Sequence, residues 1–260
     1  MLDLPPRPVS PMPANNIHPR IVAHRGFAAR YPENTLDAVR AAYALGVRMV
    51  EIDVQIAADG VPVLLHDADL QRTAGRPERI FDLDAATATR ICVGEPARLG
   101  ARFPEARLPT LAACVALVAE APERRLCVEI KAESIAHHGL ERTVDRVADA
   151  IGPHLGQCTL ISYDEAAIAY ARESTRAEIG WVLTRYDDYS CRIANRLAPE
   201  YLFCNHQKLP PGDEALWHGP WAWICYEVTD PALAQALFLR GVHLVETMAV
   251  DALLPALAHA

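Results

Sequence analysis

The sequence lacks any apolar run of about 20 residues, the length that a membrane-spanning helix needs. Its Pro-rich start, residues 1–20, also lacks the apolar stretch of a secretory signal. No cluster of lysine and arginine is present, and a net charge of −8 opposes binding to phosphate backbones and anionic membranes. We therefore expect a cytoplasmic protein, without stable membrane insertion and without nucleic acid as a partner. A small anionic substrate remains compatible, because a metal ion can reverse the field inside one pocket.

Paired cysteines and a glycine-rich nucleotide loop are missing as well. The seven cysteines are odd in number and never form a C-x-x-C pair, so neither a disulfide framework nor a zinc site is indicated. We expect them to be reduced core residues. What remains is an ordinary globular composition, with 51% apolar and 22% charged residues in a chain of 260. Such a chain can bury a sizeable core.

Short apolar runs alternate with segments of helical periodicity after an N-terminal arm at residues 1–19. Strands are predicted at 21–24, 49–54, 61–65, 126–130, 158–161, 177–183, 201–204, 221–226 and 242–245. Helices are predicted at 35–45, 111–120, 140–151, 165–173, 186–197, 231–240 and 250–259. Asp59 and Gly60 favour a hairpin turn, which sets 61–65 apart as a hairpin arm.

Eight main strands alternating with helices imply parallel pairing, and eight units in this length favour a closed barrel. The predicted fold class is therefore α/β, a (β/α)8 TIM barrel over residues 20–260. Residues 68–108 break the alternation and hold few large apolar residues, and we interpret them as a small insertion after the second strand. An open, doubly wound sheet is the alternative, and the missing glycine-rich loop counts against it.

Carboxylates occupy two of the predicted strands at matching positions. Glu51 and Asp53 are two residues apart, so they point to the same side, and Glu129 and Lys131 repeat the spacing. Their positions at carboxyl ends of strands place them on the face of a barrel that carries active sites. Burying three carboxylates together is unfavourable without a cation. Oxygen ligands of this kind suit Mg²⁺ or Ca²⁺.

Two histidines and an arginine also stand at strand ends. His24 and Arg25 end the first strand, and His66 and Asp67 end the hairpin arm. Two histidines can act as acid and base in a displacement, because imidazole titrates near neutral pH. Arg25 and Lys131 can bind a phosphate group. Together with a metal ion, this set of side chains describes phosphodiester cleavage.

At this point the sequence resembles the glycerophosphodiester phosphodiesterase family, in its bacterial cytosolic type. The resemblance rests on AHRGFAARYPENT, VEIDVQIAADGVPVLLHD, LPTL and VEIK, which hold the family's HR, E-x-D, HD and E-x-K motifs in order. Later segments that resemble the family are ISY at 161–163, NHQKL at 205–209, YEVTDP and GVHLVET. The similarity covers about residues 20 to 255.

The resemblance implies hydrolysis of glycerophosphodiesters to sn-glycerol 3-phosphate and an alcohol. It assigns His24 and His66 to acid–base catalysis. It assigns Glu51, Asp53 and Glu129 to Mg²⁺ or Ca²⁺. It assigns Arg25 and Lys131 to the phosphate. The implied mechanism uses the glycerol 2-hydroxyl as an internal nucleophile, which forms a cyclic phosphate that water then opens.

Three further residues are predicted to bind substrate: Tyr163, His206 and Tyr226. Core packing is the default for the two tyrosines, and a surface loop is the default for the histidine. Departures from the family occur at 226–229, where Tyr-Glu-Val-Thr replaces W/Y-T-V-N, and at Thr247-Met248, which replaces Thr-Asp. These departures put the leaving-group specificity in question more than the chemistry.

The sequence leaves the roles of several other polar residues open. Glu227 and Glu246 either form salt bridges or shape the pocket. Asp67 and the pair Glu33-Asn34 are balanced between a site role and a structural one. His137 and His138 are predicted to start a solvated helix.

Two other functions compete with the leading one. A lysophospholipase D-type enzyme would share the chemistry but need an exposed apolar lip for an acyl chain. A barrel that has lost activity would serve only as a binding module, and it would be expected to have lost at least one motif residue. The oligomeric state is open, with a homodimer as one candidate.

Overall fold

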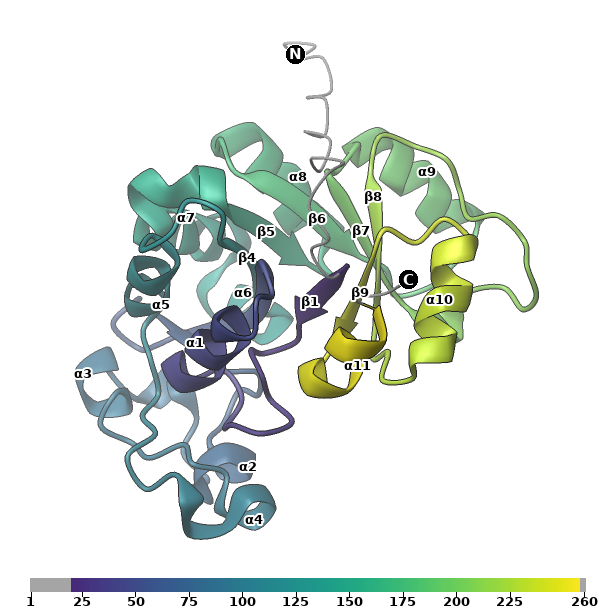
Figure 1. Cartoon of the computed structure of the whole chain (residues 1–260). Helices are drawn as coiled ribbons and strands as arrows, with labels where there is room; N and C mark the ends of the chain where they lie inside the picture. Colours follow the sequence, from purple (N-terminus) through teal and green to yellow (C-terminus); the bar gives the residue numbers. More distant parts are fainter. Residues whose placement is uncertain (1–19, 258–260) are drawn as a thin grey trace.

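The computed structural model describes residues 20–257, in which eight parallel strands close into a barrel inside a layer of helices (Figure 1). The strands are β1 (Ile21–Ala23), β2 (Met49–Ile56), β4 (Arg125–Ile130), β5 (Cys158–Ser162), β6 (Glu178–Val182), β7 (Tyr201–Asn205), β8 (Ala222–Tyr226) and β9 (Leu244–Thr247). Each pairs with the next, and β1 pairs with both β2 and β9, which closes the sheet. The predicted (β/α)8 barrel is confirmed. The predicted arm at 1–19 lies outside the described residues.

The hairpin arm is a ninth strand, β3 (Pro62–Leu64), that lies antiparallel to β2. The turn between them closes where the Val61 carbonyl accepts from Ala57 at 2.9 Å, and Gly60 adopts a φ of 84°. Leu65 then donates to the Asp53 carbonyl at 3.1 Å. The hairpin thereby carries His66 back along β2 to the level of Asp53, where the carboxylates lie.

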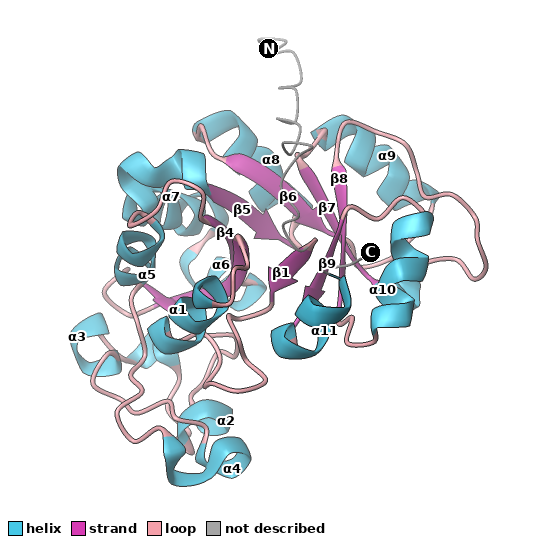
Figure 2. Cartoon of the chain, in the orientation of Figure 1, coloured by secondary structure: helices cyan, strands magenta, loops and turns pink. Residues whose placement is uncertain are grey.

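Eight helices form the outer layer, drawn in cyan in Figure 2. They are α1 (Leu36–Ala44), α5 (Leu111–Val118), α6 (Ala132–His138), α7 (Leu140–Ile151), α8 (Glu165–Ser174), α9 (Asp188–Leu197), α10 (Pro231–Leu239) and α11 (Val250–Leu257). Side-chain caps begin several of them, as where Thr35 accepts from the Ala38 amide at 3.2 Å. Short 3-10 helices, η3 (Gly152–Gln157) and η4 (His206–Lys208), precede β5 and follow β7.

The helix α6 corrects the expectation for His137 and His138. They end α6 rather than start a helix, because Gly139, with a φ of 88°, separates α6 from α7. The His137 ring stacks on Phe81 at 4.5 Å, and His138 Nε2 lies 3.1 Å from the Ile56 carbonyl oxygen. The pair therefore contacts other elements instead of water alone.

Two apolar layers hold the barrel together. One lies between strands and helices, and the other fills the barrel interior with residues such as Val22, Ile161, Phe203 and Ile224. Burial of this kind stabilises by roughly 25 cal/mol per Å² of apolar surface. All seven cysteines are free and five are buried, as expected, whereas Cys92 is exposed and Cys191 half-buried.

The apolar residues of segment 68–108 form a core of their own. It holds α2 (Gln71–Ala74), η1 (Ile80–Asp82), α3 (Ala85–Ala88), α4 (Pro96–Leu99) and η2 (Gly100–Arg102). Leu70, Ile80, Phe81 and Leu108 are buried together with Val63 of β3. The labels α2, α3 and α4 stand together at the lower left of Figure 1, beyond α1. The segment is thus a small packed subdomain that rests on the hairpin arm.

Candidate active site

Three carboxylates meet at the carboxyl ends of β2 and β4. The two strands pair so that Asp53 lies opposite Glu129, and Glu51 precedes Asp53 on the same side of β2. Glu51 and Asp53 are each 1% exposed. Single ligand atoms of these three side chains lie within 4.8 Å of one another. We call this group the carboxylate triad.

Two cations contact the carboxylate triad. Lys131 Nζ donates to Glu129 at 2.8 Å and to Asp53 at 3.3 Å, and Arg25 Nε lies 3.1 Å from Asp53 Oδ2. The Arg25 backbone has a φ of 55°, and its N–H donates to Glu51 Oε2 at 3.0 Å. Asp53 therefore contacts two cations, whereas Glu51 receives only a neutral amide from the same turn.

The pKa values follow this unequal pairing. Burial is the largest influence and raises the pKa of Glu51 well above its usual value, and Asp53 raises it further. Burial and Asp53 also raise the pKa of Glu129, against the opposing effect of Lys131. For Asp53, burial raises the pKa, but Arg25 and Lys131 outweigh it and hold the pKa below the usual range. The positive charge near Glu51 and Glu129 is therefore too small to offset the burial of their carboxylates.

A divalent cation fits the residues of the carboxylate triad. Glu51 Oε1 is buried and has no hydrogen-bond partner among the described residues. A buried charged oxygen without a partner is costly, and a cation relieves that cost. The three side chains offer only oxygen ligands, which suit a hard ion such as Mg²⁺ or Ca²⁺.

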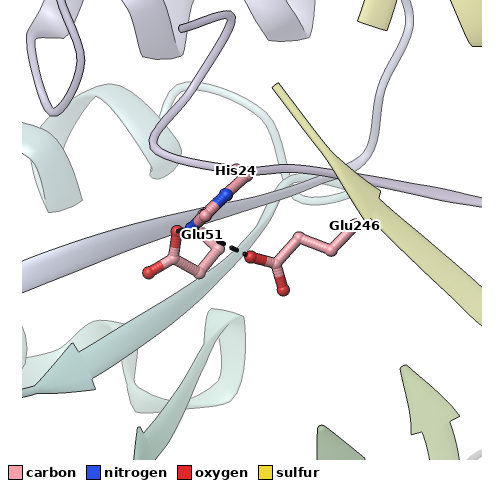
Figure 3. Close-up of side chains that lie close together, drawn as sticks. All are labelled: His24, Glu51 and Glu246. Atoms are coloured by element: carbon pink, nitrogen blue, oxygen red, sulfur yellow. Dashed lines mark ion pairs between the residues drawn. The ribbon is translucent and has the colours of Figure 1, made fainter. Parts of the chain in front are cut away.

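The two histidines have different surroundings. His24 Nε2 lies 3.5 Å from Glu246 Oε1 and 3.8 Å from Glu51 Oε2. Figure 3 shows these three side chains together. Burial, followed by the charge of Arg25, lowers the pKa of His24 to about 4, so its ring is neutral at pH 7. His66 is more open, with a side chain 34% exposed, and its Nδ1 lies 2.6 Å from Asp67 Oδ1. The same cavity thus holds a partly buried, neutral imidazole and a more accessible one that is oriented by a carboxylate.

One cavity of about 130 Å³ gathers nine of the ten predicted site residues. They are His24, Arg25, Glu51, Asp53, His66, Glu129, Lys131, Tyr163 and Tyr226. Glu227 and Glu246, which the sequence left undecided, also line it. His206, predicted to bind substrate, begins η4 after β7 and is not among the lining residues.

A second ring of contacts holds Arg25 and Asp53 in place. Arg25 donates to Glu33 at 2.9 Å, and the Asn34 side-chain amide donates to Asp53 Oδ2 at 2.8 Å and accepts from the Asp53 backbone at 3.0 Å. Arg72 of α2 donates to both oxygens of Glu33 at 2.7 and 2.8 Å. Burial raises the pKa of Glu33, but Arg72 and Arg25 lower it below the usual value. Sequence reasoning missed Arg72 because it stands in the insertion, where no strand end marks it.

The part of the rim formed by the later strands is aromatic and acidic. The hydroxyls of Tyr163 and Tyr226 lie 2.9 Å apart. Glu227, with a φ of 63°, accepts from the Asn205 side-chain amide at 2.7 Å. These residues end or directly follow β5, β7 and β8, so the rim combines the carboxyl ends of the later strands.

Fold and site together define a class: TIM-barrel proteins with a buried, carboxylate-rich site at the carboxyl ends of the strands. Within that class, the model of the glycerophosphoryl diester phosphodiesterase family matches residues 24–249. The chain belongs to this family, and the resemblance seen in the sequence is confirmed.

Named relatives match parts of the chain. Glycerophosphodiester phosphodiesterase 1 of Rattus norvegicus is 41% identical over 90 residues, which are 35% of this chain and 27% of the relative. A glycerophosphodiester phosphodiesterase of Caldanaerobacter subterraneus is 31% identical over 121 residues, 46% of this chain and 49% of the relative. The matched part therefore spans about half or less of these relatives.

Solved structures share the whole fold. A phosphodiesterase of Oleispira antarctica, in complex with the product sn-glycerol-3-phosphate, has a TM-score of 0.79 at 21% identity, covering 92% of this chain and 96% of that one. A glycerophosphodiester phosphodiesterase of Thermotoga maritima has a TM-score of 0.67 at 21% identity, covering 92% and 98%. Between residues 20 and 257, none of the helices is both long and apolar enough to span a membrane.

Proposed function

We propose that the protein is a metal-dependent glycerophosphodiester phosphodiesterase that releases sn-glycerol 3-phosphate and an alcohol. The observation that carries this proposal is the single cavity in which two histidines, two cations and the carboxylate triad meet. The family membership and the product named in the Oleispira antarctica complex support the same substrate class.

The carboxylate triad would hold Mg²⁺ or Ca²⁺. Such an ion supplies positive charge beside a phosphoryl oxygen and offsets the negative charge that develops there. Arg25 and Lys131 border the same cavity, and we assign them to the phosphate oxygens. Their contacts with Asp53 and Glu129 already orient both side chains toward the site.

The histidines supply proton transfer in this proposal. The neutral ring of His24 is ready to accept the proton of the glycerol 2-hydroxyl as that hydroxyl attacks phosphorus. We assign to His66, whose ring is oriented by Asp67, the transfer of a proton to the departing alkoxide. Water then opens the cyclic phosphate with the two roles reversed. The geometry required is that of an intramolecular reaction, in which proximity replaces a bimolecular encounter.

The leaving alcohol would lie against the aromatic rim. Tyr163 and Tyr226 line the cavity and fit the assigned role in substrate binding. For His206 that role stays a prediction. The lysophospholipase D alternative gains no support, because the large apolar side chains Leu70, Ile80, Phe81 and Leu108 of the insertion are buried and form no lip. We retain a cytoplasmic location and a homodimer as predictions.

Release of sn-glycerol 3-phosphate from glycerophosphocholine tests the proposed function. We expect EDTA to abolish release, Mg²⁺ or Ca²⁺ to restore it, and His24→Ala and His66→Ala each to lower kcat by about 100-fold or more. His154→Ala, far along the chain in η3, is the matched control and should keep full activity. Full activity in EDTA would refute the metal role. Ligand binding without turnover in the metal-loaded protein would favour the inactive binding barrel.

A further inference from the structure

Three side chains gather where the barrel closes: His24 after β1, Glu51 on β2 and Glu246 on β9. We call them the His24 triad. Since β1 pairs with both β2 and β9, the three side chains point toward one another (Figure 3). Single ligand atoms of all three lie within 4.8 Å of one another. Glu51 belongs to both triads, but Glu246 and His24 do not belong to the carboxylate triad.

The spacing in the His24 triad suits a bridging ion better than hydrogen bonds. The distances from His24 Nε2 are 3.5 Å to Glu246 and 3.8 Å to Glu51. Hydrogen bonds of this type measure about 2.7 to 3.2 Å. A tetrahedral zinc ion, with bonds of about 2.0 to 2.2 Å, separates its ligand atoms by about 3.4 Å. The observed separations are close to that value.

The carboxylate of Glu246 also lacks a cation. Glu246 is 3% exposed, and within residues 20–257 its side chain accepts no hydrogen bond and pairs with no lysine or arginine. Arg25 pairs with Asp53, and Lys131 pairs with both Asp53 and Glu129. A buried carboxylate that points at an imidazole without a cation is a costly arrangement, which a bound cation would relieve.

We propose that the His24 triad is a second metal site, which takes zinc and is distinct from the Mg²⁺ or Ca²⁺ site of the carboxylate triad. A nitrogen ligand with two carboxylates suits zinc, whereas Mg²⁺ and Ca²⁺ prefer oxygen ligands. Zinc bound to Nε2 occupies the lone pair that would accept the substrate's proton. The site therefore acts as an inhibitory one, and this second part rests on the proposed function of His24.

Zinc binding without substrate tests the site. Equilibrium dialysis of the full chain against Zn²⁺, in saturating Mg²⁺, should find one zinc per chain. Glu246→Gln, on β9, and His24→Gln, in the turn after β1, should each weaken zinc binding at least tenfold. Glu227→Gln is the matched control, since Glu227 lines the same cavity outside the triad. Unchanged zinc affinity in both triad variants would refute the proposed zinc site. The site would also be refuted if Glu129→Gln were the one variant that lost zinc binding, because zinc would then occupy the carboxylate triad.

Inhibition is measured separately, by release of sn-glycerol 3-phosphate at rising Zn²⁺ in saturating Mg²⁺. We expect zinc to inhibit the wild type and Glu227→Gln, and Glu246→Gln to need at least tenfold more zinc for the same fractional inhibition. Zinc that binds without inhibiting would overturn the regulatory role. Because dialysis needs no turnover, failure of the proposed activity is distinguishable from failure of the zinc site.

Discussion

Arg72 links the insertion to the active centre through two carboxylates. It donates to Glu33 and, at 2.7 Å, to Asp67, and these acids in turn contact Arg25 and His66. One guanidinium thus positions both a phosphate-binding and a proton-transfer side chain. Such supporting contacts orient a site without touching the substrate.

Replacing Arg72 should therefore reduce activity while leaving the fold intact. We expect Arg72→Gln to lower kcat/KM by about tenfold, the usual effect of losing an outer contact. Arg76→Gln is the matched control, because within residues 20–257 the Arg76 side chain pairs only with Glu78 of the same loop, away from the site. Steady-state kinetics on glycerophosphocholine measure both. Equal activity in the two variants would show that Arg72 does not position the site.

At the scale of residues, local sequence patterns predicted the site side chains that stand where strands end. His24, Glu51 and Glu129 each stand at or near the end of an apolar run, so their grouping followed from the rule for parallel barrels. Arg72 carries no such mark, because it stands in a four-residue helix. Its contact with Glu33 depends on how the insertion folds back, which no local pattern specifies.

At the scale of elements, α1 packs tightly against the loop that carries Arg25. Gly26 has a φ of 78°, and a Cβ at this position would lie 2.6 Å from the Ala38 carbonyl carbon. The Phe27 amide donates to that same carbonyl group at 3.0 Å. The close approach of backbone to helix therefore sets the position of Arg25, and only glycine permits it.

Gly26→Ala should lower the free energy of unfolding by about 3 kcal/mol or more, because backbone strain and a clash add together. Gly46→Ala is the matched control: Gly46 has a φ of 90° but open space around its Cβ position. It should cost only the strain, about 1 kcal/mol. Urea unfolding of both variants measures the difference. Equal losses would show that α1 moves aside without cost.

Elements with strong periodicity were predicted closely, and a missed one has a clear cause. The helix predicted at 140–151 is α7, because its apolar positions Val144, Val147 and Ile151 repeat at helical spacing and face the core. The helix α6 was missed because it has only seven residues, of which Ser134 alone is buried. An element of that length is held by its contacts with β2 rather than by its own pattern.

At the scale of the whole molecule, stability depends on the charge of the buried site. Burial is the main effect that raises the pKa of Glu246 well above 4.5, and Glu129 and Asp53 raise it further. A carboxyl group whose pKa is raised by folding costs no stability below its unfolded pKa, because both states are protonated there. Between the unfolded and the folded pKa, the unfolded chain releases the proton while the folded chain keeps it, so the free energy of unfolding falls as pH rises. The metal-free barrel therefore carries an electrostatic cost that grows from about pH 4.5 upward.

Glu246→Gln should remove that cost. In EDTA we expect the variant to unfold at a higher temperature than the wild type, by the equivalent of about 2 kcal/mol at pH 8 and by less at pH 5. Glu227→Gln, at the exposed rim, should match the wild type at both pH values. Thermal unfolding followed by circular dichroism measures the difference. If the difference in unfolding temperature between Glu246→Gln and the wild type did not change with pH, the ionisation of Glu246 would not be the cause of the electrostatic cost.

The sequence by itself determined the barrel, the carboxylate triad and the two histidines, because alternating periodicity and strand ends are local features. Only the tertiary structure decided the register in which β9 pairs with β1, with Glu246 opposite Val22, which brings Glu246 beside His24 from the far end of the chain. The same holds for Arg72 beside Glu33. Contacts between distant segments depend on strand register and on how insertions pack, and these follow from the whole core rather than from any one stretch of sequence.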